Sequence, residues 1–340
     1  MTSHASRLVG LMLTLALCAC ATPHVQSPLT PPPGFAGPTI ADRAFVVQDG
    51  ARLPFLHWGP QGTEPDVVIV ALHGMNDHKA AYRLAGPWWA EHGITTYAYD
   101  QRGFGQAPGR GEWGGDLLLE DLRTITGLVR ARHPGARIAV VGESMGGAVA
   151  IAAMTSDRPP AADRVVLLAP AVWGWSSQSP LNRAGLWVAA RAMGDRAVEA
   201  PEWAVRLIVS SDNRVELIRN GRDPDSLFST RFDTLSGLVG MMETASAGLG
   251  GLTTPTLLLY GADDQVIRAE PMRRALERAG PTDALHTAYY RGGYHILNRD
   301  LQAEVVYRDV AAWLRDAEAP LPSGAPPVLE AMRTTGPRPN

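Results

Sequence analysis

Residues 137–154 read RIAVVGESMGGAVAIAAM. The apolar run Arg137–Gly142 predicts a buried strand, and the small-residue run Met145–Met154 predicts a helix directly after it. Between them Ser144 stands in the pattern G-x-S-x-G, and its glycine neighbours suit a turn too tight for side chains. In this strand–turn–helix context the pattern is typical of a nucleophilic serine, although the pentapeptide alone occurs often by chance. We therefore predict that Ser144 is a nucleophile rather than a surface serine in a glycine-rich turn.

Other β-prone and helix-prone segments alternate on both sides of this stretch. The strands that we expect are Ala44–Gln48, Leu53–Trp58, Asp66–Leu72, Ile94–Tyr99, Arg164–Ala169, Thr256–Tyr260 and Leu285–Tyr290. The helices that we expect are Lys79–Glu91, Asp116–Arg132, Ala269–Arg278 and Leu301–Ala317. This alternation predicts an α/β fold with a mostly parallel central sheet and helices on both faces. Ligands of such sheets bind at the carboxyl ends of the strands, so we expect the site there.

Residues 173–252 interrupt the alternation and are too many for a loop in a compact domain. They contain helix-prone stretches at Leu181–Met193, Pro201–Ile208 and Leu235–Ala247, so we predict a helical lid inserted between two strands. Tryptophan and methionine side chains in this segment suit either an acyl-chain groove or the lid's own core. Its arginines suit either phosphate headgroups or the solvated surface.

The N-terminus has the pattern of a bacterial export signal. Arg7 precedes the apolar run 8–19, which is shorter than the roughly 20 residues of a transmembrane helix. The run ends in LCAC at residues 17–20 and resembles a lipobox, in which small residues precede a cysteine that is acylated. We therefore expect a lipoprotein signal peptide at 1–19 and lipidation of Cys20. The alternative is a plain signal peptide that is cut next to this motif.

Proline-rich segments flank the predicted folded domain, residues 41–318. Residues 20–40 lack an apolar period, and we expect an extended, mobile spacer. Residues 319–340 are expected to form a disordered tail, although Val328-Leu329 could dock on the body. No Asp follows Cys20 directly. In the lipobox pattern this favours the outer membrane, with the domain exported to face the periplasm.

The composition excludes several classes of protein. Two cysteines, both near the N-terminus, cannot build a disulfide scaffold or a four-ligand zinc site. The formal charge of −3 provides no basic field for nucleic acid. Loss of the signal and acylation of Cys20 would leave no free thiol, which excludes a cysteine nucleophile. We expect no metal and no organic cofactor, and the oligomeric state stays open.

A nucleophilic serine needs a base, which is a histidine oriented by a carboxylate. Downstream of Ser144 the sequence has only His286, inside a predicted strand, and His295, in a glycine-rich loop after the last strand. A base at a strand end must be His295. The acid should follow the preceding strand, where Asp263 and Asp264 stand side by side.

Acyl transfer also needs two N–H donors for the developing oxyanion. One is expected from the amide of Met145, which directly follows Ser144 at the start of a helix. The other is expected from the amide of Met75, in the loop HGMNDH after the strand Asp66–Leu72. His73 and His78 in this loop are expected to shape it rather than to bind a metal.

From Ala41 to Asp316 the chain resembles an α/β-hydrolase of the monoacylglycerol lipase and lysophospholipase type. The resemblance rests on five blocks in the family's order: His73–His78, Asp100–Gly105, Gly142–Gly147, Gly261–Val266 and Gly292–Leu297. In the lipase form of the first block, Gly and Glu stand where this chain has Asn76 and Asp77. The register of the fourth block favours Asp264 over Asp263 as the acid.

The resemblance implies a serine hydrolase that cleaves carboxylic esters of lipids with one acyl chain, through an acyl-enzyme. Its partners would be the lipid substrate and, through Cys20, a membrane. The alternatives on the same triad are a thioesterase, a C–C hydrolase and an aminopeptidase. The non-enzymatic alternative is a lipoprotein in which the same fold serves only as a scaffold. Dehalogenases and epoxide hydrolases of this fold use an aspartate nucleophile, so Ser144 argues against them.

Overall fold

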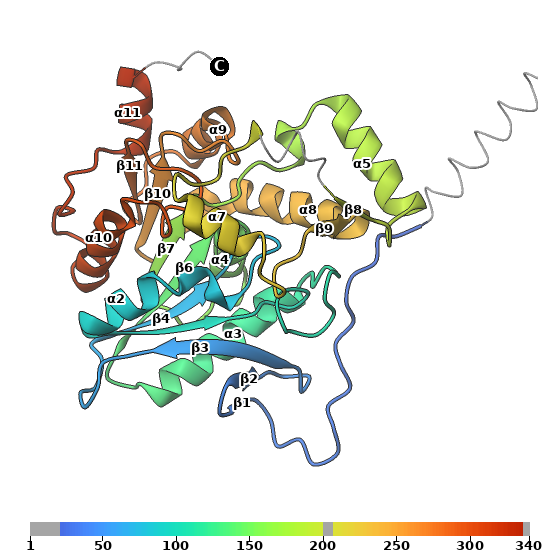
Figure 1. The fold of residues 1–340 in the computed structure, drawn as a ribbon, viewed down its shortest axis with the longest axis horizontal. Coiled ribbons are helices and arrows are strands. Elements are labelled where there is room, and N and C mark those ends of the chain that lie inside the picture. The colour runs from blue at the N-terminus through green and yellow to red at the C-terminus, as the bar shows by residue number, and fades with distance from the viewer. Residues whose placement is uncertain (1–20, 200–206, 336–340) are drawn as a thin grey trace, which may run out of the picture.

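The computed structural model describes residues 21–199 and 207–335, so the predicted signal peptide and Cys20 lie outside the described residues. A nine-stranded sheet runs through the molecule in the order β1-β2-β3-β5-β4-β6-β7-β10-β11 (Figure 1). Its strands are β1 (Thr39–Ile40), β2 (Ala44–Val46), β3 (Arg52–Trp58), β4 (Val67–Leu72), β5 (Ile94–Tyr99), β6 (Arg137–Glu143), β7 (Arg164–Leu168), β10 (Thr256–Gly261) and β11 (Leu285–Tyr290). From β5 to β11 all neighbours are parallel, while β1, β2 and β3 pair antiparallel at one edge. The predicted mostly parallel sheet is confirmed.

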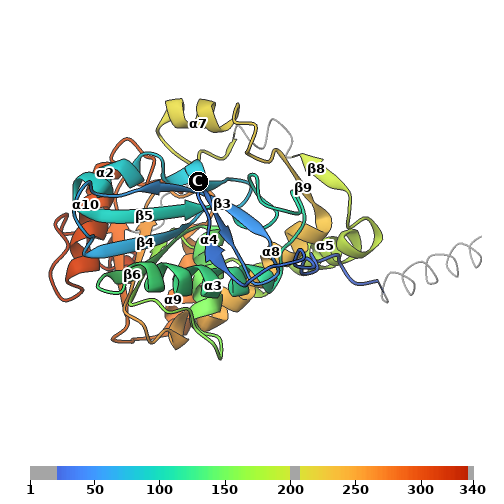
Figure 2. The same cartoon turned by 90° about the horizontal axis from the view of Figure 1, so that it is seen from below.

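Helices cover both faces of the sheet (Figures 1 and 2). One core contains residues of α3 (Leu117–Arg132), α4 (Met145–Met154), α9 (Ala269–Ala279) and α11 (Val328–Thr335). The opposite core contains residues of η1 (Lys79–Tyr82), α2 (Ala85–Glu91) and α10 (Ala303–Arg315). In β4, Val68 and Val70 belong to the first core, whereas Val67 and Ile69 belong to the second. Both faces of a strand with this alternation are buried, which explains its continuous apolar sequence.

The predicted helix Lys79–Glu91 is divided into η1 and α2. A continuous helix would need the N–H of Pro87 as donor to the carbonyl of Arg83, and proline has no N–H. The break therefore falls one turn before Pro87, and the chain restarts as a helix with the proline in its first turn.

The predicted lid is a helical insertion between β7 and β10, which are neighbours in the sheet. It contains η2 (Trp175–Ser177), α5 (Pro180–Ala192), β8 (Ala197–Glu199), α7 (Arg214–Asn220), β9 (Ser229–Arg231), α8 (Phe232–Gly248) and η3 (Leu249–Gly251). Helix α8 lies against α4, and α5 lies against α8 on the outside of the molecule (Figure 1). The antiparallel pair β8–β9 and helix α7 were not expected from the sequence. The predicted helix Pro201–Ile208 lies mostly outside the described residues.

The C-terminal segment differs from the prediction of a disordered tail, which is wrong for Val328–Thr335. These residues form α11, whose Val328 and Ala331 are buried in the core. Before the helix, the carbonyl of Pro326 accepts a hydrogen bond of 2.9 Å from the N–H of Tyr289 in the edge strand β11. The N–H of Val328 donates to Oγ1 of Thr287 in the same strand, at 3.0 Å. An exposed sheet edge has unpaired donors and acceptors, and here the tail satisfies part of them.

The N-terminal spacer has no helix or strand before β1, and part of it contacts the body: the N–H of Leu29 donates to Oδ2 of Asp49 at 2.8 Å. Gln26 is 8% exposed, and its amide N–H donates to the carbonyl of Trp113 at 2.8 Å. Its side-chain Nε2 donates to the carbonyls of Gly109 and Glu112, each at 3.1 Å. These hydrogen bonds offset the ordering cost of a segment that has few apolar residues.

Across residues 21–199 and 207–335, we find no helix with the length and apolar character needed to span a membrane.

The turn between β6 and α4 is packed without space for extra atoms. A Cβ on Gly146 would lie 2.4 Å from the carbonyl oxygen of Leu72, and one on Gly142 would lie 2.5 Å from that of Gly146. Ser144 itself has φ 52° and ψ −114°, a conformation that non-glycine residues rarely adopt. The glycines therefore allow the serine to stand at the tip of the turn.

We predict that Gly146→Ala lowers the free energy of unfolding by about 1–3 kcal/mol or more, because the methyl group must displace the backbone of β4. Gly127→Ala is the matched control, since Gly127 lies exposed in α3 with no atom within 4 Å of the position that an added Cβ would take. That control should be neutral or gain up to about 1 kcal/mol of helix stability. Thermal denaturation of both variants measures the difference, and equal stabilities would contradict the packing described.

Candidate active site

Four loops meet at the carboxyl ends of β4, β6, β10 and β11. They carry, in chain order, the predicted oxyanion residue Met75, the predicted nucleophile Ser144, the predicted acid Asp264 and the predicted base His295. In an open parallel sheet the carboxyl strand ends share one edge, which brings these distant residues together. Ser144 is 9% exposed and His295 is 5% exposed, so the site is largely shielded from water.

His295 and Asp264 are in direct contact. Nδ1 of His295 lies 2.9 Å from Oδ2 of Asp264, so with a proton on Nδ1 the imidazole donates to the carboxylate. The other oxygen, Oδ1, accepts the amide N–H groups of Val266 at 2.8 Å and Ile267 at 2.9 Å. These bonds fix the carboxylate, which in turn fixes the ring with Nε2 available for a second partner. It is Asp264 of the two adjacent aspartates that contacts the histidine.

The pKa of His295 is raised above its ordinary value of 6.5. Burial favours the neutral ring and lowers the pKa, but the negative charge of Asp264 and its hydrogen bond raise it by more. The charge of Glu143, the neighbour of Ser144, adds to this rise, while Arg299 opposes it. The pKa of His295 therefore depends on charged residues beside the serine turn as well as on Asp264.

The two predicted oxyanion donors lie on loops that touch each other. Met145 begins α4 and is buried, and Met75 follows Gly74 in the loop after β4. A Cβ on Gly74 would lie 3.3 Å from Cβ of Ser144, so this loop passes within van der Waals distance of the serine. Asn76 has φ 62°, an uncommon left-handed conformation that turns the chain directly after Met75. Ser144, Met75 and Met145 all line the same cavity.

Three charged residues beside the site were not predicted from the sequence: Asp77, Glu143 and Arg299. Arg299 is 1% exposed and forms ion pairs with both carboxylates, each at 2.7 Å. Their positions lie inside or next to the motif blocks, but no local pattern indicates that they pair. A charged residue at the second position of G-x-S-x-G was the available signal, because a buried charge there requires a partner.

His73 shapes its loop, as the sequence indicated. Its Nδ1 lies 2.8 Å from the carbonyl of Gly74, and its Nε2 lies 3.1 Å from the amide N–H of Gln101. Since the amide must donate to Nε2, the ring is neutral with its proton on Nδ1. Burial accordingly lowers the pKa of His73.

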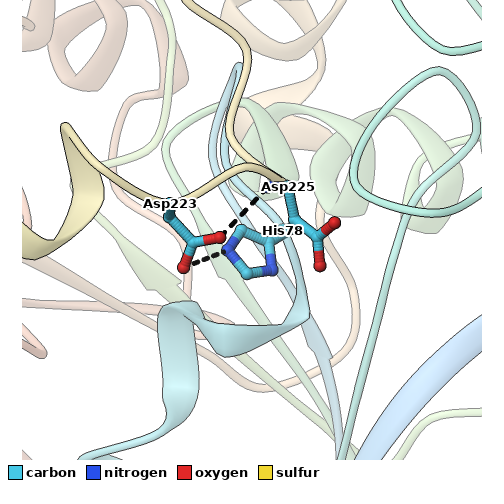
Figure 3. Close-up of side chains that lie close together, drawn as sticks. All are labelled: His78, Asp223 and Asp225. Atoms are coloured by element: carbon cyan, nitrogen blue, oxygen red, sulfur yellow. Dashed lines mark hydrogen bonds and ion pairs between the residues drawn. The ribbon is translucent and has the colours of Figure 1, made fainter.

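His78 lies beside two lid carboxylates, Asp223 and Asp225 (Figure 3). Its Nε2 is 3.2 Å from Oδ2 of Asp223, and one ligand atom from each residue falls within 4.8 Å of the others. Such a trio can in principle bind a metal ion. Here Arg219 already lies 2.9 Å from Asp223, and Lys79 lies 3.8 Å from Asp225. Because these cations compensate both carboxylates, we interpret the cluster as an ion-pair contact between the lid and the loop of Met75.

A cavity of about 630 Å³ opens at Ser144 beneath the lid. It is lined by Met75, Ser144, Met145, Ala171, Trp173, Trp175, Gln178, Leu181, Asn182, Gly185, Leu186, Leu235, Leu238, Val239, Met242, Val266 and Ile267. None of these described lining residues carries a charge. Of the two roles considered for the lid's large side chains, Trp173 and Trp175 line the cavity, Met241 is buried in the core, and Met242 does both. The space suits a long apolar ligand whose end reaches the serine.

A family model described as serine aminopeptidase, S33, matches residues 63–302, which is more than half of the chain. The chain belongs to this Hydrolase_4 family. The matched range begins before β4 and ends after the loop of His295, so it includes all four loops of the site.

Curated relatives of this Hydrolase_4 chain include lipases. It is 26% identical to the monoacylglycerol lipase of Mycolicibacterium smegmatis over 289 residues, covering 81% of this chain and 97% of the relative. It is 25% identical to the human monoglyceride lipase over 289 residues, covering 83% of this chain and 93% of the relative.

Solved structures agree on the fold of this family member. A soluble variant of the Saccharomyces cerevisiae monoglyceride lipase superimposes with a TM-score of 0.66 at 18% identity, covering 85% of this chain and 98% of that one. The Paleococcus ferrophilus monoacylglycerol lipase gives a TM-score of 0.60 at 21% identity, covering 77% and 98%. The chain has the α/β-hydrolase fold.

We predict that NMR titration of the full chain gives His295 a pKa above 6.5. In Asp264→Asn the pKa should fall below that of the wild type, because the carboxylate charge is lost while burial, which favours the neutral ring, remains. Asp263→Asn is the matched control and should change the pKa much less. A larger effect from the control would show that the orienting carboxylate is misassigned.

Proposed function

We propose that this chain is a serine hydrolase that cleaves carboxylic esters of lipids with a single acyl chain, such as monoacylglycerols. The observation that carries the proposal is a shielded serine that opens into a large cavity without charged lining residues, beside a histidine–aspartate pair. The serine supplies the chemistry, and the cavity supplies the selection for an apolar chain.

The reaction proceeds in two halves. His295 takes the proton of the Ser144 hydroxyl through Nε2 as the oxygen attacks the ester carbonyl, and Asp264 stabilises the resulting imidazolium. The amides of Met75 and Met145 donate to the oxyanion of the tetrahedral intermediate. His295 then returns the proton to the leaving alcohol, and an acyl-enzyme remains. Water, activated by the same histidine, attacks the acyl-enzyme and releases the fatty acid and the free serine.

The cavity favours esters over the peptides that the family description suggests. An aminopeptidase must bind the positively charged N-terminus of its substrate, and burying an ammonium group without a partner is very unfavourable. No carboxylate belongs to the described lining of the cavity. An acyl chain, in contrast, gains about 0.8 kcal/mol for each buried CH₂ group. The names of the curated relatives, monoacylglycerol and monoglyceride lipases, support the same choice.

We predict that the wild type hydrolyses long-chain monoacylglycerols faster than aminoacyl anilides, and that Ser144→Ala loses the ester activity by at least about 10⁴-fold. The variant should also lose labelling by a fluorophosphonate, because the attacking oxygen is gone. Product release measured by chromatography and probe labelling on a gel provide the two readouts. Full activity in Ser144→Ala, with an unchanged melting temperature, would exclude the mechanism.

Gly185→Trp is a control that separates the cavity from the chemistry. Gly185 lines the cavity from α5, and no atom lies within 4 Å of the position of an added Cβ, so a larger side chain can enter the space. Hydrolysis of long-chain monoacylglycerols should fall, whereas hydrolysis of a short p-nitrophenyl ester and fluorophosphonate labelling should remain. Equal losses for both substrates would indicate damage to the site instead.

We further propose that the chain is exported, acylated at Cys20 and anchored in the outer membrane, facing the periplasm. The signal pattern supports this, and so does the position of the spacer. Gln26 is bound on the carbonyls of Gly109, Glu112 and Trp113, and Oγ1 of Thr234 in the lid donates to the neighbouring carbonyl of Gly111 at 2.8 Å. Gln26 lies six residues after Cys20. A fully extended segment of this length spans about 20 Å at most. An anchor at Cys20 would keep the lid side of the molecule close to a membrane that contains the substrate.

We predict that a fatty-acid analogue fed to cells labels the wild type, and that Cys20→Ser abolishes the labelling because no thiol remains to accept the lipid. Cys18→Ser is the matched control and should stay labelled. Separation of the inner and outer membranes then locates the labelled protein. Labelling that survives in Cys20→Ser, or that is lost in Cys18→Ser, would contradict the assignment.

A further inference from the structure

Arg299 connects the three loops on which the reaction depends. It lies four residues after His295, and its guanidinium group is buried between two carboxylates from other loops. Nη1 donates to Oδ2 of Asp77 in the loop of Met75 at 2.7 Å, and Nη2 donates to Oε1 of Glu143 beside Ser144 at 2.7 Å. A planar guanidinium with its nitrogens in a rigid fork fixes the distance between two such partners better than an ammonium group does.

Each partner of Arg299 controls the position of a reacting group. The amide N–H of Asp77 donates to the carbonyl of Gly74 at 3.3 Å and closes the turn that contains Met75, while Oδ1 of Asp77 accepts the amide N–H of His78 at 2.8 Å. Asn76 lies between Met75 and Asp77 with φ 62°, so the chain turns directly after Met75 and the residue held by Arg299 is part of the same turn. On the other side, Oε1 of Glu143 would lie only 3.2 Å from a Cβ on Gly74, so the two loops are in contact at this point.

Stability alone is a weak explanation for this network. Within the described residues, Nε of Arg299 and Oε2 of Glu143 are buried without a hydrogen-bond partner. Removing charges from water is expensive, and replacing a complete buried ion-pair group by uncharged side chains of similar size is often neutral or stabilising. The network therefore costs the fold something that a simple apolar contact would not cost.

We propose that Arg299 is a positioning residue, and that it holds the amides of Met75 and Met145 at the separation that the oxyanion needs. The inference rests on the proposed esterase function and deepens it. Asp77 transmits the position of Arg299 to the Met75 turn, and Glu143 transmits it to the turn that carries Ser144 and Met145. Donors that are fixed before the reaction lose no energy by reorganising during it, so their alignment affects the rate rather than substrate binding.

The network also affects the pKa of the base, His295. The charged groups that act on His295 are Asp264 from the loop after β10, Glu143 from the serine turn, and Arg299 from its own loop. Asp300 lies nearby and accepts the amide N–H of Tyr294 through Oδ2 at 2.7 Å. Glu143 raises the pKa of His295 and Arg299 lowers it, so the pair partly cancels and leaves Asp264 as the main source of the raised pKa.

The test compares a broken network with one that is removed completely, in the full-length chain purified in detergent. Arg299→Met alone leaves the carboxylates of Asp77 and Glu143 without their cationic partner and should lower the melting temperature. The triple variant Asp77→Asn, Glu143→Gln, Arg299→Met has no charged side chain left in this network, so most of the stability should return. Fluorophosphonate labelling of Ser144 should nevertheless stay about 100-fold slower than in the wild type, since misplacement of about 1 Å has this effect on a rate. A triple variant that regains both stability and the wild-type labelling rate would overturn the proposal.

Arg299→Lys keeps the positive charge and serves as the second variant if the triple variant does not fold. One ammonium group cannot span both carboxylates as the fork does, so kcat on a p-nitrophenyl ester should fall at least about 10-fold while KM changes little. Full kcat in Arg299→Lys would show that charge alone suffices and would contradict the proposed alignment.

The pH profile measures the electrostatic effect of the network on His295, which is separate from the alignment of the amides. Activity requires neutral His295, so kcat/KM rises with pH through the pKa of the free enzyme. Glu143→Gln removes a negative charge that raises this pKa and keeps the positive charge of Arg299, so the acidic limb should move to lower pH. An unmoved limb would contradict this part of the inference. A wild type that the probe does not label would instead refute the proposed function, which separates the two failures.

Discussion

The close approach of two backbones at the serine turn is the constraint on which the site depends. The carbonyl oxygen of Leu72 at the end of β4 would lie 2.4 Å from a Cβ on Gly146, and the carbonyl oxygen of Gly146 would lie 2.5 Å from a Cβ on Gly142. Only because both positions are glycine can α4 start directly after β6 and turn back against the sheet. This geometry forces Ser144 into a rare conformation at the tip of the turn, with its side chain at the cavity. Strain of this kind persists where the surrounding packing determines the backbone completely.

Around this turn the four strand-end loops are joined by buried polar contacts in addition to the apolar packing of residues such as Met145 and Ile267. Asp264 joins His295 to the loop after β10, and Arg299 joins His295's loop to the loops after β4 and β6. Beyond them, His78 and Asp223 join the loop of Met75 to the lid. Loops usually move more than the strands that they connect. Directional contacts with two or more partners hold these loops in one arrangement, which is what an oxyanion site requires.

Helix α5 of the lid has an apolar surface with little burial of its own, whereas α8 of the lid is packed into the core. In α5 only Ala190 is buried, and Leu181 is 81% exposed although it also lines the cavity. A helix held by few buried side chains opens at low cost. The N-terminal segment is bound through Gln26 to the carbonyls of Gly109 and Glu112, next to Gly111, whose carbonyl accepts a hydrogen bond from Thr234 of the lid.

Local sequence patterns predicted the sheet and the helical insertion and pointed to Ser144 and His295, because each depends on residues that are adjacent along the chain, whereas Asp264 was preferred over Asp263 on the resemblance to the family motif. A strand shows an apolar run, the serine turn shows its glycines, and His295 was the histidine that remained after a predicted strand accounted for His286. Sequence patterns failed where a residue's role depends on a distant neighbour. The composition of the proline-rich tail predicts disorder, yet Val328 is buried because the edge strand β11 offers Thr287 and Tyr289 as partners. Asp77, Glu143 and Arg299 are separated by 66 and 156 residues. They pair only because β4 and β6 are adjacent in the sheet and the chain returns to the same edge after β11, where burial in a medium of low polarity makes opposite charges seek each other.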